Sequence, residues 1–182
     1  MLVSHQVDDR LDRSARGDEE AFAGLVREHQ RMVFSIGYHF LRDATLAEEM
    51  AQEVFLHLHR NLRSIESPAH LVYWLRKVAS HRSIDQSRRA RLRPRVGLDQ
   101  APEPRTGPDG HDPLLKVMLE RLVAGLPERA RAIVVLRYQE DLEPGEIAEM
   151  LEIPVGTVKS NLHRALKFLR GKLERAGKGV AP

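Results

Sequence analysis

The chain has 182 residues, a formal net charge of +3 and no cysteine. This length suits one domain or two small ones, and the absence of cysteine excludes disulfides, thiolate metal sites and thiol catalysis. The longest unbroken apolar run, residues 132–136, is far too short to cross a bilayer. Because the polar N-terminus also lacks the apolar core of a signal peptide, we expect a cytoplasmic protein.

Charge is unevenly distributed along the chain. Acidic residues outnumber basic ones over residues 18–53, whereas over residues 76–95 the many cations face a single acid, Asp85. A second basic block covers residues 159–178. Two basic blocks separated by acidic or neutral sequence predict two nucleic-acid surfaces and a basic partner for the acidic part.

After a polar tail over residues 1–17, the pattern predicts a helix over residues 18–41 that Asp18 caps. Apolar residues at helical spacing would form its buried side: Phe22, Leu25, Val26, Val33, Ile36 and Phe40. In the next helix, Thr45 and Glu48 have the spacing of a capping box. Its apolar stripe would comprise Leu46, Ala47, Met50, Ala51, Val54, Leu58 and Leu62.

The opposite face of this second helix carries polar residues and one leucine: Glu48, Glu49, Gln52, Glu53 and Leu56. A leucine surrounded by carboxylates and an amide has the character of a small docking surface. Single exposed leucines are also common on ordinary protein surfaces. The pattern alone therefore leaves both interpretations open.

Ser67 and Pro68 predict the start of a third helix, as N-cap and first helical residue. Its apolar positions are Leu71, Val72, Trp74, Leu75, Val78, Ala79 and Ile84, and we assign Trp74 to the core. Its outer face would be basic and polar, comprising Arg76, Lys77, Ser80, His81, Arg88 and Arg89. The loop over residues 63–67 is either a nucleotide pocket or a plain connection.

Residues 92–112 are rich in proline and glycine and poor in apolar residues, which predicts a linker. Beyond it, Asp112 with Pro113 and then Pro127 predict the starts of two short helices. No alternating strand pattern competes with these helices. The prediction is an all-α protein of two small helical bundles on a flexible linker. The bundles would occupy residues 18–91 and 113–176, with a short tail over residues 177–182.

Residues 142–173 predict two helices joined by a tight break. Pro144 suits the first position of a helix, and Pro154 disfavours helical geometry at the residue before it. One face of the second helix repeats polar groups every three or four residues: Lys159, Ser160, His163, Arg164 and Lys167. This is the helix-turn-helix arrangement, whose second helix enters the DNA major groove. The alternative is a solvated basic face on an ordinary helical hairpin.

The stretch EIAEMLEIPVGTVKSNLHRALKFL resembles the fourth conserved region of the extracytoplasmic-function (ECF) group of bacterial sigma-70 family sigma factors. The stretches GDEEAFAGLVREH, AEEMAQEVFLHL and WLRKVASHRSIDQSRRAR resemble the second region of the same group. Two motifs in the right order cover nearly all of residues 17–173. The resemblance implies a sigma factor that binds core RNA polymerase and directs promoter-specific transcription initiation. It further implies stress or envelope-response target genes and an anti-sigma factor as a partner.

The resemblance also assigns sites. Docking on a basic coiled coil of the polymerase falls on Glu49, Gln52, Glu53 and Leu56. Recognition and melting of the downstream (−10) promoter element fall on Arg76, Lys77, Ser80, His81, Arg88 and Arg89, with residues 63–67 near a flipped base. Reading of the upstream (−35) element falls on Lys159, Ser160, Asn161, His163, Arg164 and Lys167. The linker would thread toward the polymerase active centre.

Four positions depart from the family pattern. His81 stands where asparagine is usual and Asn161 where arginine is usual, which changes the groups available to bases. Glu152 occupies a turn position where glycine is common, so a positive φ there would cost about 1 kcal/mol. Glu143 stands where serine or threonine normally caps, which predicts a weaker cap that its charge partly offsets.

No pattern for catalysis is present, and no cofactor or metal is predicted. His57 and His59 lie about 200° apart around a helix and cannot share a metal ion. Neither a glycine-rich phosphate loop nor a serine nucleophile elbow occurs. The alternative function is a stand-alone helix-turn-helix regulator with an N-terminal interaction domain, although the first half carries its own basic helix. A third hypothesis is an adaptor whose first half binds only proteins.

Overall fold

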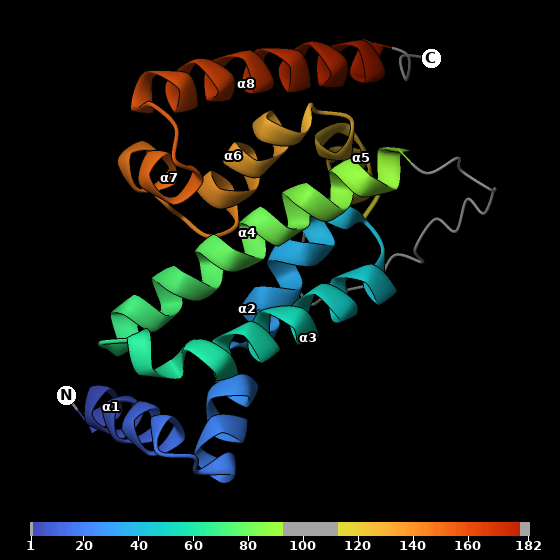
Figure 1. Ribbon diagram of the computed structural model, residues 1–182. Coiled ribbons are helices and arrows are strands. Elements are labelled where there is room, and N and C mark those ends of the chain that lie inside the picture. Colours follow the sequence, from blue (N-terminus) through green and yellow to red (C-terminus); the bar gives the residue numbers. More distant parts are fainter. Residues whose placement is uncertain (1, 93–112, 179–182) are drawn as a thin grey trace. The chain divides into compact units, whose positions relative to one another are not determined.

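The computed structural model describes residues 2–92 and 113–178 (Figure 1). Over these two ranges the chain forms helices and no strand, which confirms the predicted all-α class. Contacts divide the chain into two compact units, Met1–Ser83 and Ile84–Pro182. Most of the predicted linker, and Asp112 as the predicted cap, lie outside the described residues. Of the helices described, none combines the length and apolar character needed to span a membrane.

The first unit contains α1 (Leu2–Ala15), α2 (Glu19–Leu41), α3 (Ala44–Asn61), the 3-10 turn η1 (Leu62–Ser64) and the beginning of α4 (Pro68–Leu92). Helix α2 packs against both α1 and α3. The predicted apolar stripes of α2 and α3 meet there, and their most enclosed side chains are Leu25, Val33, Ile36, Phe40, Met50 and Leu58. Gly37 allows the close approach, because a Cβ at that position would clash with the Met50 side chain.

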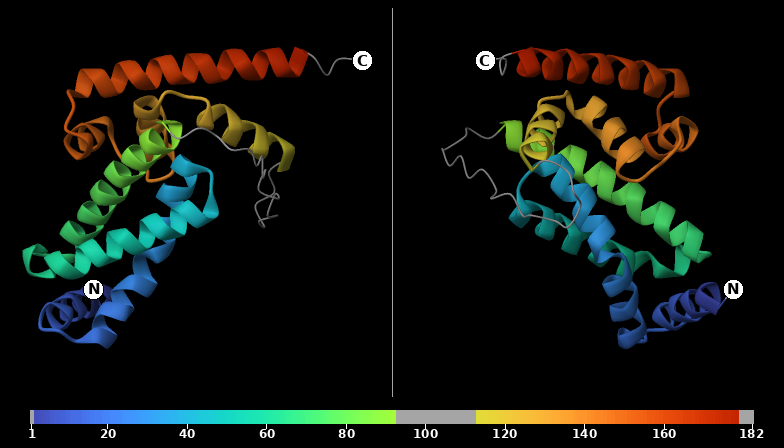
Figure 2. Two further views of the ribbon diagram at one scale, coloured as in Figure 1. Left: turned by 45° about the vertical axis from the view of Figure 1, so that its right-hand side comes forward. Right: turned by 180° about the vertical axis from the view of Figure 1, so that it is seen from behind.

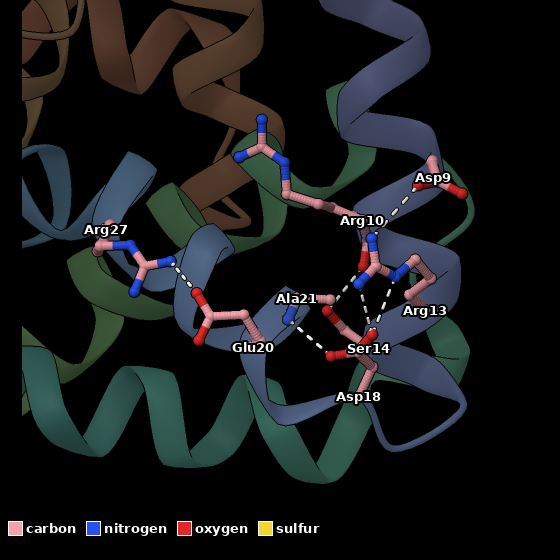
Figure 3. Close-up of polar contacts among 8 residues, drawn as sticks. All are labelled: Asp9, Arg10, Arg13, Ser14, Asp18, Glu20, Ala21 and Arg27. Carbon is pink, nitrogen blue, oxygen red and sulfur yellow. Dashed lines mark hydrogen bonds and ion pairs between the residues drawn. The ribbon is translucent and has the colours of Figure 1, made fainter.

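The predicted polar tail over residues 1–17 is wrong, since Leu2–Ala15 form a helix. Leu11 and Ser14 of α1 are buried. Ion pairs also join α1 to residues beyond it. Arg10 contacts Glu28 at 2.9 Å. Arg13 contacts Asp18 at 2.7 Å (Figure 3). The helix has few apolar residues, so its sequence resembles a polar tail. Its stabilising partners follow it in the chain and become adjacent only after folding.

Helix starts follow local side-chain chemistry. Asp18 accepts a hydrogen bond from the Ala21 amide at 3.0 Å, and Ser67 Oγ accepts one from the His70 amide at 3.1 Å, which confirms both predicted caps. For α3 the predicted capping box at Thr45 is wrong. Asp43 caps instead, accepting from the Leu46 amide at 3.0 Å. The reason is that α2 ends at Arg42 in a left-handed turn (φ 57°), which lets α3 begin immediately afterwards.

We expect Asp18 to make the first unit less stable in acid. The hydrogen bond from the Ala21 amide, and next the bond from Arg13, hold the pKa of the Asp18 carboxyl below its usual value. A lowered pKa gives stability that is present above the unfolded-state pKa and is lost as the pH falls through the folded-state pKa. Asp18→Asn keeps a capping side chain that does not titrate. Its melting temperature should therefore fall less than that of the wild type between about pH 5 and about pH 2.

Thermal unfolding followed by circular dichroism measures this difference. Asp12→Asn removes a charge from an exposed residue of α1 and serves as the matched control. The control should retain the wild-type acid sensitivity. If Asp18→Asn and the wild type lost equal stability in acid, the cap carboxyl would not be the titrating group.

The second unit contains α5 (Pro113–Ala124), α6 (Glu128–Tyr138), α7 (Pro144–Leu151) and α8 (Val155–Lys178), besides the end of α4. Helix α8 lies along the other three and packs on each of them (Figure 2). One apolar cluster joins α6 to α8 and comprises Leu126, Ala130, Val134, Ala165 and Leu169. Because this cluster occupies one side of α8, the opposite side of the helix faces solvent.

A buried arginine, which the sequence analysis missed, holds the connection between α5 and α6. Arg131 is enclosed within α6 and donates hydrogen bonds from Nη2 to the carbonyl oxygens of Ala124 and Leu126. A buried guanidinium needs such acceptors because desolvation of an unpaired charge is costly. These bonds satisfy carbonyl groups at the end of α5, where no helical partner is available.

Candidate functional site

The exposed face of α3 carries every residue predicted to dock on polymerase. Glu49, Gln52 and Glu53 are exposed, and Leu56 is 59% exposed. The neighbouring Val54, Phe55 and Leu58 are buried. Leu56 therefore belongs to the surface, as its position on the helix predicts, and gives an otherwise polar face an apolar centre.

Glu53 on this face is paired with a cation from α4. Arg82 Nη1 donates to Glu53 Oε2 at 2.7 Å, and both side chains remain partly exposed. The two residues are 29 positions apart in the chain. Sequence reasoning placed Glu53 in the docking face and Arg82 in the basic block, but nothing in the local pattern joins them.

The basic face of α4 is only partly as predicted. Arg88 and Arg89 are exposed, while Arg76, Lys77 and His81 are half-buried. Ser80 is 0% exposed, so its predicted place on the outer face is wrong. The hydroxyl suggested exposure, yet serine is small enough to fit within a packed helix face. Ser83 and Ser87, which follow at helical spacing, are buried in the same way.

His81 is bound to its own helix through one ring nitrogen. Its Nδ1 lies 2.9 Å from the Lys77 carbonyl oxygen, which can only accept a hydrogen bond. The proton therefore resides on Nδ1, and Nε2 of the neutral ring is left as an acceptor. An asparagine at this position offers a donor and an acceptor on one amide. The departure from the family pattern thus changes the available hydrogen-bonding groups.

The loop before α4 borders a cavity with a basic lining. Residues 62–64 form the turn η1, and the following Ile65 is buried. A cavity of about 370 Å³ is lined on this side by His59, Arg60 and Arg63, and also by Arg16, which directly follows α1. Cationic side chains around an open cavity suit a phosphate-bearing ligand.

Helix α7 and its turn show how the second unit accommodates two unusual glutamates. Glu152 adopts a left-handed conformation (φ 55°), and its amide donates to the Ala148 and Glu149 carbonyls. At the start of α7 the carboxylate of Glu146 accepts from the Glu143 amide at 2.7 Å. In this bond a side chain inside the helix reaches back to the backbone of the cap residue, as in a capping box. The sequence analysis missed it, and it supports the start of α7 where no serine or threonine is present.

Replacing Glu152 by glycine should stabilise the second unit by about 1 kcal/mol, because glycine adopts positive φ without a steric penalty. The loss of the Glu152 side chain is a separate effect, which Glu152→Ala isolates while retaining the backbone strain. Chemical denaturation followed by circular dichroism measures both variants. A gain in Glu152→Ala equal to that in Glu152→Gly would assign the effect to the side chain instead of φ.

The predicted reading face of α8 is exposed. Lys159, Ser160, His163, Arg164 and Lys167 all face solvent. Arg164 Nε donates to the Ser160 carbonyl at 3.2 Å, which holds its guanidinium along the helix. Asn161 is half-buried and donates to the Thr157 carbonyl at 2.7 Å. Asn161 therefore lies at the edge of this face and is engaged by its own backbone.

The apolar side of α8 is narrow. Val158, Ala165 and Leu169 are buried, but Val155 and Leu166 are more than two-fifths exposed. Phe168 is similarly exposed, and Lys172 lies over its ring.

No metal-binding geometry is found in the part of the chain that the structure describes. Over residues 2–92 and 113–178, no three histidine, aspartate or glutamate side chains gather closely enough to hold an ion. The functional surfaces found there are instead one acidic helix face and two basic ones. These surfaces suit a basic protein partner and nucleic acid, respectively.

Comparison with known proteins identifies the chain. The family Sigma-70 region 2 matches residues 25–93, and Sigma-70, region 4 matches residues 116–169. The ECF RNA polymerase sigma factor SigW of Bacillus subtilis is 30% identical over 179 residues, covering 90% of this chain and 95% of SigW. SigL of Mycobacterium tuberculosis, also an ECF sigma factor, is 31% identical and covers 92% of this chain and 97% of SigL. The chain belongs to the ECF sigma factors.

The family predicted from the two motifs is thereby confirmed. This sigma factor binds core RNA polymerase and promoter DNA and directs transcription initiation. Two solved structures share its fold. CnrH, in complex with the cytosolic domain of CnrY, has a TM-score of 0.66 at 20% identity and covers 93% of this chain and 98% of CnrH. RpoE of Bartonella quintana, in complex with the anti-sigma factor NepR, has a TM-score of 0.67 at 16% identity, with coverage of 84% and 96%.

Proposed function

We propose that this sigma factor divides its work among three helices. The exposed face of α3 docks on polymerase, α4 recognises and melts the downstream promoter element, and α8 reads the upstream element. The observation that carries the proposal is the isolated exposure of Leu56 at 59%, within an acidic helix face whose apolar neighbours are buried. Such a face suits a basic partner with an apolar patch.

The DNA assignments rest on exposed cations and hydrogen-bonding groups. On α4, His81 offers an acceptor, and Arg88 and Arg89 offer positive charge. On α8, Arg164 has the guanidinium fork that pairs with guanine in the major groove, while Lys167 suits a phosphate contact. Ser80 is excluded from direct contact by its burial. The cationic cavity beside residues 63–67 favours a nucleotide site over a plain connection.

The proposed domains are region 2 over residues 18–91 and region 4 over residues 113–176, joined by a linker over residues 92–112. The matched ranges 25–93 and 116–169 support them. Since α1 packs on α2, we add residues 2–15 to the first domain. No cofactor or catalytic activity of its own is required, and the cytoplasm is where bacterial polymerase and its template meet.

We propose that a protein inhibitor controls this sigma factor and that its targets are stress or envelope-response genes. RpoE, which shares the fold, is solved with its anti-sigma factor NepR. The exposed apolar residues of α8, among them Leu166 and Phe168, provide surface that a helical inhibitor could cover. Copurification of the chain with its cellular partners tests for such an inhibitor.

Run-off transcription with purified core polymerase on a promoter library tests the function directly. Addition of the chain should yield transcripts from a subset of promoters that share two spaced elements. Without polymerase the chain should bind the same DNA weakly and with strong salt dependence. The reason is that two DNA-binding domains on a flexible linker gain little affinity from binding together. Protection of a specific operator by the isolated chain at physiological salt would favour the stand-alone regulator.

A further inference from the structure

The ion pair between Arg82 and Glu53 joins two surfaces with different proposed partners. Glu53 belongs to the docking face of α3, and Arg82 follows His81 on α4. Their side chains meet at 2.7 Å, with Arg82 39% and Glu53 60% exposed. In the free chain, therefore, a carboxylate of the docking face neutralises a cation of the DNA-binding helix.

The exposure of this pair makes it easy to exchange. Ion pairs in contact with water contribute little to stability, because solvent screens the attraction and two long side chains lose freedom. Either partner can leave for a stronger ligand without exposing a buried charge. A basic protein surface is such a ligand for Glu53, and DNA phosphate is one for Arg82, whose guanidinium can bind two phosphate oxygens at once.

Helix geometry places Arg82 where it can join the other cations. Arg82 and Arg89 are seven residues apart on α4, which brings them to the same side after two turns. The exposed acid Asp85 lies about one turn from Arg82. Release of Arg82 from Glu53 would thus add a second cation to the side of α4 that already carries Arg89. The negative charge of Asp85 lowers the net positive charge of this side.

We propose that Arg82 is a promoter-DNA contact that Glu53 masks in the free chain and that docking on polymerase releases. The proposal rests on the functions proposed above for α3 and α4. When a basic surface of the polymerase takes the Glu53 carboxylate, the Arg82 guanidinium becomes available to the phosphate backbone. By thermodynamic linkage, DNA bound at Arg82 favours polymerase binding at Glu53 by the same factor.

The free chain provides the first test, with a fluorescein-labelled single strand of mixed sequence as the probe. Fluorescence anisotropy at several salt concentrations measures the dissociation constant and its salt slope. Glu53→Gln should tighten binding and steepen the slope by about 0.7, the contribution of one phosphate contact on a single strand. An unchanged slope would overturn the proposal.

Glu49→Gln is the matched control for loss of negative charge. Glu49 lies one turn before Glu53 on the same exposed face and forms no ion pair within the described part of the chain. It should leave the salt slope unchanged because it releases no cation. In an Arg82→Gln background, Glu53→Gln should no longer steepen the slope. Persistence of the effect there would show that Arg82 is not the released cation.

The holoenzyme provides the second test. Arg82→Gln should lower the salt slope of promoter binding by about 1. It should leave affinity for core polymerase unchanged or raise it by up to about fivefold, the limit for an exposed ion pair. Arg82→Lys, which retains the charge, should keep the wild-type slope. If Arg82 only positioned Glu53, Arg82→Gln would instead weaken polymerase binding and leave the slope unchanged, which would overturn the proposal.

These results separate the masked contact from the proposed docking function. Suppose Leu56→Lys leaves polymerase binding intact while Glu53→Gln still steepens the salt slope of the free chain. The docking assignment then fails and masking of Arg82 stands. Suppose instead that Leu56→Lys abolishes docking and Glu53→Gln has no effect on the slope. Docking then stands and the masked contact is refuted.

Discussion

Leu56→Lys should weaken binding to core RNA polymerase by about 30-fold or more, the effect of losing an interface hot spot. Leu56 is the apolar centre of the acidic face of α3, so a partner that covers this face must desolvate it. Lysine removes that apolar contact and adds a positive charge against a basic partner. The free energy of unfolding should change little, because the side chain already lies in water.

Titration of fluorescently labelled core polymerase measures the affinity, and circular dichroism measures the melting temperature. Leu58→Lys is the matched control, since Leu58 lies two residues away on α3 but is fully buried. That variant should unfold the first unit. Unfolding of Leu56→Lys would show that Leu56 serves the core in solution. Full stability with normal polymerase binding would place the docking surface elsewhere.

The features predicted correctly from the sequence are those that local chemistry controls. Asp18 and Ser67 cap their helices because each side chain needs only an amide three residues away. The exposure of Leu56 follows from the helical repeat, which places it opposite the buried stripe of α3. Pro144 likewise begins α7, where its missing amide costs nothing.

Errors arose where the tertiary fold decides between local alternatives. Thr45 and Asp43 both suit a cap, and the end of α2 at Arg42 favours Asp43. Helix α1 has few apolar residues and depends on partners that follow it in the chain, such as Glu28. Ser80 looks polar in sequence but is small enough for the interior. Periodicity carries no information about these contacts.

In the candidate sites, too, local features could be predicted from the sequence and tertiary contacts could not. The exposed face of α8 follows from spacing alone, as does the docking face of α3. The pairing of Glu53 with Arg82 could not be predicted, because it depends on how α3 and α4 pack. The hydrogen bond of His81 to the Lys77 carbonyl is local, but the tautomer that it imposes becomes evident only from the ring orientation.

Substitutions in the two proposed DNA-binding helices, α4 and α8, should affect promoter preference independently. Arg164→Ala should alter preference only in the upstream element and reduce affinity about 5- to 150-fold if Arg164 pairs with a guanine, since such a pair is worth about 1–3 kcal/mol. Lys167→Ala, on the same exposed face, should weaken all promoters alike and lower the salt slope by about 1, because phosphate contacts carry no sequence information. A promoter-library selection with holoenzyme measures both effects.

His81→Asn should change preference only in the downstream element. The hydrogen bond to the Lys77 carbonyl leaves Nε2 of the His81 ring as an acceptor, whereas asparagine presents a donor beside an acceptor and can pair with adenine. The same library separates this variant from Arg164→Ala, because each should shift base frequencies at one element and spare the other. A shift of the downstream element in Arg164→Ala, or unchanged preferences in both variants, would refute the assignment of α8 to the upstream element and α4 to the downstream one.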